Sequence, residues 1–565
     1  MARHFNAPVS GVYVANPGYV LNAAGVPRGA VISSVNGKPV AAMAEFRDIV
    51  AALPQGARAA LRYSTLDDPK GSETRVMRMD RAWFPAKVCR RDDKTGLWPC
   101  EELAAAPAAA SVQPARTTFV AGNDKRANEI AASLVLVTFD MPFSVAGITE
   151  RNYHGTGVIV DAERGLVVVD RNTVPVAAGD VRLTFGGSIE VPGKVEYVHP
   201  LHNLAVVSFD PQALDGTPIR AVKFDTRELE PGEPVTVVGL GGDSRLRTLA
   251  TYVATTDDVN FPLSRTLQFR DANLEVVSLV NSPSEFDGVI TGKDGRVRAL
   301  WSSFATEGAR DAVQINRGMP ASVVLEAVAA ARDDKPLYSL ETEFEALPIA
   351  AARKLGLPAE WVEKLEQRNP AHRQVLAVAR VAAGSGAARV LQEGDLLLAV
   401  NGVTLNRFRE VEEATQSPRV QVTVLRDGAE KVVDVETAAL RGEDIDRLLL
   451  WAGAVIHAPH RAMTIQRAIP PEGVFVAYFA YGSPATRYGL FAGRRIVEVD
   501  GRPIADLDAF IAAVSGRPDR SSVRLKTVTW NGSTGVTTMK LDQNYWPAYD
   551  LRRNSAGEWE RKAIP

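Results

Sequence analysis

Gly394-Asp-Leu-Leu-Leu-Ala-Val-Asn-Gly402 is an apolar run enclosed by two glycines. Its pattern indicates the fold of a large part of this chain. A short apolar run bounded by turn residues predicts a buried strand, and the Asn-Gly pair at its end predicts a tight turn. Val411 follows nine residues after the second glycine, where a short helix would turn an apolar side chain inward. The stretch therefore predicts a strand, a turn and a helix that share one core.

The same pattern occurs twice more along the chain. It runs from Gly29 to Gly37 with Phe46 after it, and from Gly493 to Gly501 with Phe510 after it. Self-similar segments predict repeated copies of one structural module. The pattern resembles the core of a PDZ domain, and its threefold occurrence makes this resemblance more specific than a single copy would.

PDZ domains bind a peptide by adding it as an extra strand at a sheet edge. The resemblance implies a loop of backbone N–H groups that holds the peptide carboxylate, followed by the receiving strand. The positions that the resemblance assigns to this loop and strand are Ser10, Gly11, Val12 and Tyr13 in the first copy, Arg373, Gln374, Val375 and Leu376 in the second, and Glu472, Gly473, Val474 and Phe475 in the third. Two alternatives stay open: ordinary edge strands without a ligand, and grooves closed by a segment of the same chain.

Between the first two copies, short β-rich segments alternate with Gly, Asp and Pro turns, as in a double β-barrel. This region contains His154-Gly-Thr-Gly-Val-Ile-Val-Asp161, then Gly165 to Val174, His199 to Val207, and Asn281 to Val297. These stretches resemble the trypsin-like domain of the HtrA/Deg family of PDZ serine proteases. The resemblance implies a mainly β fold with short helices, in which a trypsin-like double β-barrel is flanked by three PDZ-like domains.

The residues at the three catalytic positions of that family are replaced in this chain. The resemblance places the catalytic His at Asn172, the Asp at Asn203 and the nucleophilic Ser at Phe286, with the register of the last set by Gly292-Lys-Asp-Gly-Arg-Val297. A serine nucleophile needs an adjacent base, and that base needs a third group to orient it. Phe286 has no hydroxyl, and Asp287 stands where glycine would let the oxyanion hole form. These replacements predict a protein without serine-protease chemistry.

A second register would make Ser282 or Ser284 the nucleophile, through an insertion in the same loop. It would require a histidine from elsewhere, and His154, His199 and His202 are near in sequence. We expect instead that His154 is a strand residue and that the other two lie in a loop with polar contacts. Two histidines are too few for a closed zinc site, which uses four ligands. No metal and no cofactor are expected.

Tail and linker composition predict the domain boundaries. Trp83-Phe-Pro85 and Trp546-Pro547 end the first and third copies, and each is followed by an Arg-Arg pair and a further Trp. The expected segments are a PDZ-like domain with a Trp-Pro tail over 1–100, an Ala/Pro-rich linker over 101–126, a degenerate trypsin-like domain over 127–332, a PDZ-like domain over 333–445, and a PDZ-like domain with a Trp-Pro tail over 446–565. The repeated tail resembles the tandem-duplicated HtrA-like proteases. It implies that this chain corresponds to their C-terminal part, with an active protease domain upstream.

Charge and hydropathy exclude some function classes. The formal net charge is −2 and no long basic block occurs, which argues against nucleic-acid binding. The apolar run from Leu448 to Ile456 is far shorter than the ~20 residues that span a bilayer, and the N-terminal residues show no apolar signal sequence. Cys89 and Cys100 would pair in an oxidising compartment or stay free thiols in the cytosol. The compartment therefore stays open, with the cytoplasm and the bacterial periplasm both allowed.

These observations favour a pseudoprotease that acts as a scaffold and peptide-binding module in protein quality control or regulated proteolysis. The expected partners are C-terminal or extended peptides of client proteins, an active HtrA-like protease domain, and further copies of the chain. The alternative is an active serine endopeptidase, through an unrecognised Ser register or together with an upstream or partner protease domain. A third hypothesis is a purely structural oligomerisation module that needs no peptide.

Overall fold

The computed structural model describes residues 10–103, 113–119, 125–259, 261–264, 266–307, 312–442, 445–554 and 557–565. The chain divides into two compact units, one formed by residues 1–113 with 559–561 and the other by the rest, and each is described by itself. It is mainly β with short helices, as predicted. Much of the expected 101–126 linker lies outside the described residues. Among those residues, no helix is both long and apolar enough to cross a bilayer.

The first unit contains a small sheet in the strand order β1-β2-β4-β5, with β3 paired to β2. Its elements are β1 (Val12–Tyr13), α1 (Val20–Ala23), β2 (Ala30–Val35), β3 (Lys38–Pro39), α2 (Met43–Ala51), β4 (Arg58–Thr65) and β5 (Glu73–Arg78). Asn36 and Gly37 have φ angles of 49° and 74°, which are the left-handed conformations that a two-residue hairpin turn requires. Phe46 of α2 packs against the core of this sheet, as its spacing predicts.

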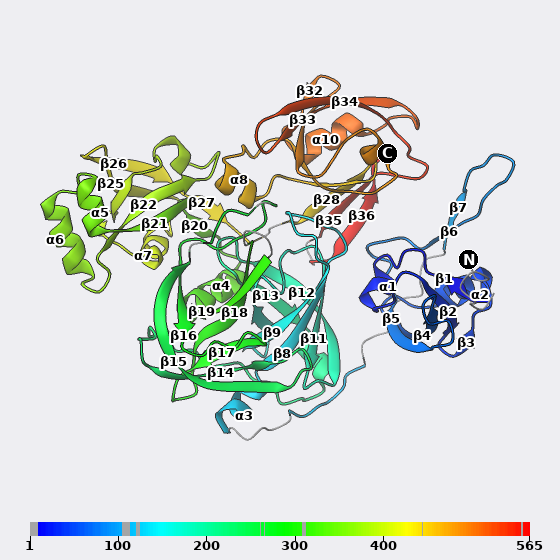
Figure 1. Ribbon diagram of the computed structural model, residues 1–565, viewed down its shortest axis with the longest axis horizontal. Helices are drawn as coiled ribbons and strands as arrows, with labels where there is room; N and C mark the ends of the chain where they lie inside the picture. Colours follow the sequence, from blue (N-terminus) through cyan, green and yellow to red (C-terminus); the bar gives the residue numbers. More distant parts are fainter. Residues whose placement is uncertain are drawn as a thin grey trace. The chain divides into compact units, whose positions relative to one another are not determined.

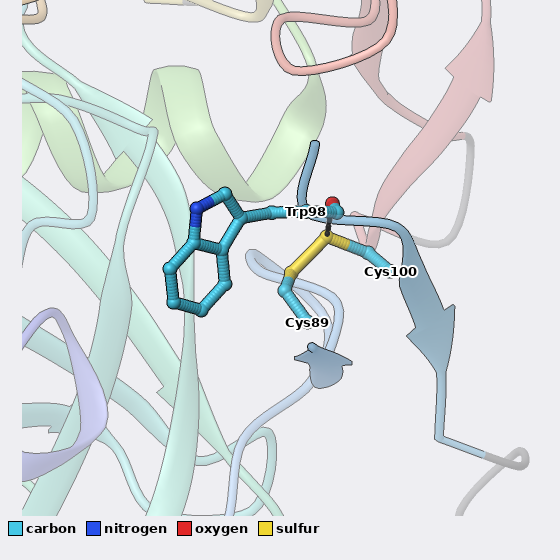
Figure 2. The surroundings of a disulfide bond; sticks show 3 residues. All are labelled: Cys89, Trp98 and Cys100. Carbon is cyan, nitrogen blue, oxygen red and sulfur yellow. Dashed lines mark hydrogen bonds between the residues drawn. A yellow bond between two sulfur atoms is a disulfide. The ribbon is translucent and has the colours of Figure 1, made fainter. Parts of the chain in front are cut away.

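A disulfide closes the hairpin that follows this sheet. The hairpin consists of β6 (Lys87–Cys89) and β7 (Cys100–Glu102). Cys89 and Cys100 lie opposite each other across the two strands and are joined by a disulfide bond (Figure 2). The Sγ of Cys100 also lies 3.4 Å from the carbonyl oxygen of Trp98. Of the two states that the sequence left open for these cysteines, the structure has the paired one.

The second unit begins with two closed six-stranded barrels, which are the cyan and green parts of Figure 1. The first barrel has the order β10-β13-β12-β11-β8-β9 and the second β14-β15-β16-β19-β18-β17. The elements of the first are α3 (Lys125–Ala131), β8 (Leu134–Asp140), β9 (Asn152–Asp161), β10 (Leu166–Val169), β11 (Asp180–Phe185), β12 (Ile189–Val198), β13 (Ala205–Phe209) and the 3-10 turn η1 (Pro211–Leu214). The elements of the second are β14 (Pro234–Leu240), β15 (Leu246–Val259), β16 (Leu274–Leu279), β17 (Asp287–Thr291), β18 (Val297–Glu307), β19 (Ala312–Pro320) and α4 (Ala321–Asp333).

The two barrels are held together by a shared apolar core and by a polar contact between strands. The core contains Val158 and Val206 of the first barrel with Val238 and Val289 of the second. Thr156 of β9 accepts a hydrogen bond from the Leu240 backbone N–H at 3.0 Å. Strand β9 of the first barrel also contacts β17 of the second, and the candidate site lies at this interface.

A six-stranded sheet follows, in the order β21-β22-β23-β25-β26 with β24 paired to β23. Its region contains β20 (Leu337–Ser339), β21 (Thr342–Pro348), α5 (Ile349–Lys354), α6 (Ala359–Arg368), β22 (Gln374–Val381), η2 (Ala387–Arg389), β23 (Leu396–Val400), β24 (Val403–Thr404), α7 (Phe408–Ala414), β25 (Arg419–Arg426), β26 (Ala429–Glu436) and β27 (Ala438–Leu440). Every residue of β23 is buried, as the apolar run predicts. Asn401 and Gly402 form the expected turn with φ angles of 50° and 77°, and Val411 of α7 is buried.

The last sheet has the order β34-β33-β31-β30-β29-β28-β35-β36, with β32 paired to β31. Its elements are β28 (Arg447–Trp451), β29 (Ala454–His457), α8 (Arg461–Arg467), β30 (Val474–Phe479), α9 (Pro484–Arg487), β31 (Arg494–Val499), β32 (Arg502–Pro503), α10 (Leu507–Val514), β33 (Ser522–Thr529), β34 (Thr534–Lys540), β35 (Tyr549–Arg553) and β36 (Trp559–Ala563). Trp451 packs edge-on against Phe510 of α10, with ring centroids 5.2 Å apart. The Trp-Pro tail supplies β35, which extends this sheet beside β28.

Candidate functional site

Two of the three predicted positions meet at the interface of the barrels. Asn172 follows β10, and its backbone N–H donates to the Asn203 side chain over 2.9 Å. Ser303 of β18 joins them, because Asn172 Nδ2 donates to its Oγ at 2.7 Å and Asn203 Nδ2 donates to its carbonyl at 2.7 Å. The amide groups of both asparagines therefore act as donors toward one serine of the second barrel. A histidine or an aspartate could not make the same set of bonds.

Two aspartates surround this network, and both are almost fully buried. Asp170 accepts from the Ser303 N–H at 2.9 Å and from the Thr173 N–H at 2.8 Å. Burial raises the pKa of Asp170, while these donors act in the opposite direction. Asp271 accepts from the Asn203 N–H at 2.8 Å, and burial raises its pKa to about 7 against the lowering effect of His202. Sequence reasoning missed both carboxyl groups, since a single aspartate in a loop carries no motif.

Phe286, at the predicted nucleophile position, is a packing residue. It is half-buried against the apolar core of the second barrel. Gly239 on the neighbouring strand leaves room for it, because a Cβ there would lie 2.8 Å from the Phe286 ring and 1.8 Å from the Asp287 carbonyl oxygen. Phe286 therefore contributes neither a hydroxyl nor a base to the interface.

Asp287, the next residue, extends toward the first barrel. Its Oδ2 lies 3.2 Å from the position that a Cβ on Gly155 of β9 would take. Its Oδ1 accepts from Asn316 Nδ2 at 2.9 Å, and Asn316 pairs with Ser303 across β18 and β19. Burial raises the pKa of Asp287 to about 8, and the Asp170 carboxyl acts in the same direction. With Asp170 and Asp271, the interface therefore holds three carboxyl groups whose pKa values are raised by burial.

The two serines of the alternative register lie in the exposed loop before β17. Ser282 Oγ donates to the Leu279 carbonyl at 3.1 Å, so its hydroxyl proton is directed at a backbone acceptor. The loop is anchored by Trp301, whose indole N–H donates to the Pro283 carbonyl at 3.1 Å. Ser284 is exposed on the same loop.

The three nearby histidines have other surroundings. His154 is an exposed residue of β9. His199 and His202 are buried in the loop between β12 and β13, with stacked rings whose centroids are 4.9 Å apart. His199 Nδ1 accepts from the N–H groups of Leu201 and His202, and burial lowers its pKa well below the usual value. Among the described residues, no group of His, Cys, Asp and Glu side chains is arranged to hold a metal ion.

The predicted peptide-binding strands differ in whether an edge is free. Val12 and Tyr13 form β1, which within the described part of the chain has a neighbour only in β2. Gln374 to Leu376 lie in β22, between β21 and β23, and Arg373 precedes that strand. Val474 and Phe475, which follow Glu472 and Gly473, lie in β30, between β29 and β31. At the second and third copies the alternative of an ordinary edge strand therefore needs correction, because both strands already have hydrogen-bonded neighbours on either side.

One edge of the middle sheet is β21, and a side chain of the second barrel is hydrogen-bonded to it. Asn273 Nδ2 donates to the Thr342 carbonyl at 2.7 Å, and its Oδ1 accepts from the Phe344 N–H at 2.8 Å. One amide group thus takes up the acceptor and the donor that an added strand would use. Sequence reasoning missed Asn273, because its partners lie about 70 residues further along the chain.

Helix α7 of the same domain is also attached to the barrels, through ion pairs. Arg407 Nε donates to Glu275 at 3.0 Å, and Arg409 pairs with Glu326 of α4. Glu412 lies 2.6 Å from His202 Nε2. Both elements that would line a peptide groove, β21 and α7, are therefore held against the barrels.

Comparison with known protein families finds PDZ sequences in three parts of the chain. A model described as a PDZ-like domain matches residues 1–56 and 444–520, and one described as a PDZ domain matches residues 363–425. These matches contain the three glycine-bounded repeats from which PDZ-like modules were predicted.

Similar proteins extend along the entire chain. A PDZ domain-containing protein of Schizosaccharomyces pombe is 31% identical over 100% of this chain, and Protease Do-like 7 of Arabidopsis thaliana is 29% identical over 100%. The pro-apoptotic serine protease nma111 of Aspergillus oryzae is 30% identical over 97%. The chain is a homologue of the HtrA-like PDZ serine proteases. It spans 57%, 64% and 55% of the length of these three relatives, respectively.

Solved structures similar to this HtrA-like chain include the HtrA-type protease AlgW with a tripeptide. It has 17% identity and a TM-score of 0.40, and the match covers 55% of this chain and 96% of that one. The structure of AlgW with a decapeptide gives 17% identity and a TM-score of 0.39, over 56% of this chain and 98% of that one.

Proposed function

We propose that this chain is a pseudoprotease that serves as a scaffold and peptide-binding module in an HtrA-like protease system. The observation that carries the proposal is the side-chain chemistry at the barrel interface. Asn172 and Asn203 donate their amide protons to Ser303, and Phe286 packs into the second barrel. Acyl transfer needs a nucleophile, a base and an orienting group within hydrogen-bond reach of one another. Phe286 offers no nucleophile and Asn172 no base, so Asn203 has no base at these positions to orient.

The hydrogen bonds at the interface support a structural use of these positions. Each asparagine donor has an acceptor on Ser303, and Ser303 in turn donates to Asp170 at 3.3 Å. Such a satisfied buried network fixes the relative position of two β-barrels, because any change leaves a buried polar group without its partner. The interface would therefore serve as a rigid support for the domains that follow it.

The proposed peptide site is the groove between β21 and α7, in competition with Asn273. PDZ grooves receive a peptide beside an edge strand, and β21 is an edge strand of the middle sheet. Two hydrogen bonds to the Asn273 amide must be exchanged for those of the incoming peptide. Client binding would then loosen the contact between this domain and the barrels, which links recognition to the position of the scaffold. An active HtrA-like protease domain and further copies of the chain are the proposed partners.

The test is labelling of the purified chain with a fluorophosphonate probe, run beside cleavage of casein. Such a probe reacts with an activated serine hydroxyl, so the proposal expects no labelled serine and no casein fragments. A variant with Asn172→His, Asn203→Asp and Phe286→Ser restores the family's residue at each of the three positions. It is tested for labelling and cleavage beside the native chain. The matched control is Ser282→Ala with Ser284→Ala, which removes the hydroxyls of the alternative register. Labelling of the native chain that this double substitution abolishes would overturn the pseudoprotease proposal.

A further inference from the structure

The hairpin β6–β7 and its disulfide take no part in the barrel interface or in the β21 groove. The two strands form a sheet of their own, and none of their side chains is buried. Neither strand pairs with a third one among the described residues. An isolated two-stranded hairpin is marginally stable at best in water. The bond between Cys89 and Cys100 is therefore the main constraint that keeps this hairpin closed (Figure 2).

The corresponding tail of the last domain is held in another way. Counted from the prolines of the two Trp-Pro tails, Pro85 and Pro547, the position of Cys89 is taken by Leu551. Leu551 is 1% exposed, and its strand β35 pairs with β28. Sheet pairing and apolar burial hold this tail, and a reducing agent leaves both unchanged. The first tail has instead a covalent bond that thiol chemistry can open and form again.

The surroundings of the bond suit exchange with an external thiol. Both cysteines are exposed, and exposed disulfides are the ones that react readily with other thiols. Arg90 and Arg91 follow Cys89, whereas two glutamates follow Cys100. Positive charge beside a sulfur stabilises its thiolate, and the better stabilised thiolate leaves faster. We therefore expect an incoming thiolate to attack the Sγ of Cys100 and to release Cys89.

The place of the hairpin in the chain gives the bond a mechanical consequence. The hairpin follows β5, the last strand of the first sheet, and precedes residue 114, where the second compact unit begins. The bond holds the Cα atoms of the two cysteines 4.0 Å apart across a sequence separation of 11. A fully extended chain of this length spans roughly 35 Å more. The bond therefore limits how far the covalent connection between the two units can reach.

We propose that the Cys89–Cys100 bond is a reversible redox site, and that its reduction by a dithiol lengthens the connection between the two units. The attacking thiolate forms a mixed disulfide with Cys100 and releases the Cys89 thiolate, which takes up a proton. The second thiol of the reductant then attacks the reductant sulfur of the mixed disulfide and releases the Cys100 thiolate, which is protonated in turn. The dithiol is thereby oxidised to a disulfide, and two electrons and two protons pass to the protein.

Reach matters for a client that engages both units at once. The effective concentration of a second binding site falls as the connection to the first becomes longer than the span that it must bridge. Reduction is therefore expected to weaken the binding of a peptide chain that engages β1 and the β21 groove together. This consequence rests on the proposed peptide function, whereas the thiol–disulfide exchange does not, so either can fail without the other.

The exchange is tested on the full chain in mixtures of reduced and oxidised dithiothreitol without denaturant. N-ethylmaleimide then blocks the free thiols, and mass spectrometry measures the labelled fraction. Samples that start oxidised and samples that start reduced are expected to converge on the same fraction, with unchanged hydrogen exchange in β2 and β4. A bond that stays oxidised without denaturant, or whose reduction unfolds the first sheet, would overturn the proposal. Brief exposure to glutathione, a monothiol, should leave glutathione on Cys100 and the maleimide on Cys89, and the reverse distribution would contradict the direction of attack.

The change in reach is tested by small-angle X-ray scattering of the oxidised and the reduced chain. Reduction is expected to increase the maximum dimension by about 15 Å if the freed residues form a coil and by about 35 Å if they extend fully. Cys89→Ser with Cys100→Ser should have the larger dimension with and without reductant. Deletion of residues 90–99 from this variant is the matched control, because it shortens the connection without a disulfide and should restore the smaller dimension. Equal dimensions of the oxidised and the reduced chain, or a deletion variant as long as its parent, would overturn the proposal.

Discussion

His202 in the first barrel and Glu412 on α7 form a buried ion pair with 2.6 Å between Nε2 and Oε1. Burial lowers the pKa of His202, but the charge and hydrogen bond of Glu412 and the charge of Asp271 more than offset it, so the net shift is upward. His202 directly precedes Asn203, whose amide belongs to the interface network. This pair therefore connects the helix beside the β21 groove to the degenerate catalytic position.

Glu412→Gln is expected to destabilise the larger unit, and more at pH 6 than at pH 9. A histidine with a raised folded pKa contributes stability that is fully present below its unfolded value near 6.5 and is lost as pH rises through the folded pKa. Removing one partner of a buried pair costs about 3 kcal/mol when the other stays charged. Denaturant midpoints at the two pH values measure the difference.

The control for this prediction is Glu413→Gln on the same helix. Glu413 pairs with Arg409, but its side chain is 60% exposed. Exposed pairs contribute roughly 0–1 kcal/mol, so this variant should unfold nearly as the native chain does at both pH values. An equal loss from Glu412→Gln at pH 6 and pH 9 would show that His202 is not charged in the folded protein.

Asp287→Asn is expected to stabilise the barrels at high pH. The Asp287 pKa is raised to about 8 by burial, with a further contribution from Asp170, whereas an unfolded aspartate ionises near 3.8. Between these values the folded state retains a proton that the unfolded state releases, so stability falls as pH rises and levels off above about 8. The neutral amide removes this dependence and should add roughly 2–5 kcal/mol at pH 9, with little change at pH 4.

The measurement is the pH profile of the unfolding midpoint for native and variant chains. Asp294→Asn, in the exposed hairpin after β17, is the matched control, and its profile should follow that of the native chain. Parallel profiles for the native chain and Asp287→Asn would mean that Asp287 is ionised within the folded interface.

Asn203→Asp, which restores the family's residue type, is expected to destabilise the fold. An aspartate loses the donor to the Ser303 carbonyl and places a carboxylate against that oxygen and near Asp271. The loss should be roughly 2–4 kcal/mol in the denaturant-derived free energy of unfolding, since a buried acceptor and a buried charge are left without partners. Asn531→Asp is the control, because the Asn531 side-chain oxygen accepts hydrogen bonds from Thr529 and Ser533 in an exposed turn, and an aspartate retains that oxygen.

The sequence predicted the modules of this fold from local patterns. The run from Gly394 to Gly402 has the strand and turn that its glycines and apolar residues imply, and Phe46 and Val411 face their cores. Such features depend on residues within about twenty positions of one another, so a single stretch contains the information.

Features that depend on distant partners were not predicted from the sequence. Whether Gln374 lies on an edge or an inner strand is decided by β21, which pairs along the full length of β22. Asn273, Asp271 and Ser303 acquire their roles only when barrels and sheet meet, and no spacing rule reports those contacts. The replacements at Asn172 and Phe286 could be recognised because a resemblance supplied the expected residue at each position.

Reduction of the Cys89–Cys100 bond is expected to loosen its hairpin alone. The bond closes a short loop with a sequence separation of 11, and a loop of this size restricts the open state by about 3 kcal/mol. Cys89→Ser with Cys100→Ser should therefore speed proteolysis between the two positions while the β1–β5 sheet stays resistant. Limited digestion followed by mass spectrometry locates the cuts, and a native-like digestion pattern would show that β6 and β7 need no cross-link.

Asn273→Ala is expected to increase the affinity of the full chain for peptides. Its amide makes two hydrogen bonds to β21, at Thr342 and Phe344, and each contributes roughly 0.5–1.5 kcal/mol net. Their loss exposes the edge of β21 and removes a competitor, so affinity should rise about tenfold. Binding to an array of C-terminal peptides measures the change, followed by titration of the strongest sequence. Asn281→Ala, which removes an exposed amide from the same barrel, should leave affinity unchanged. Because the gain arises at β21, a peptide that binds the two variants equally well would show that the groove beside α7 is not the receptor.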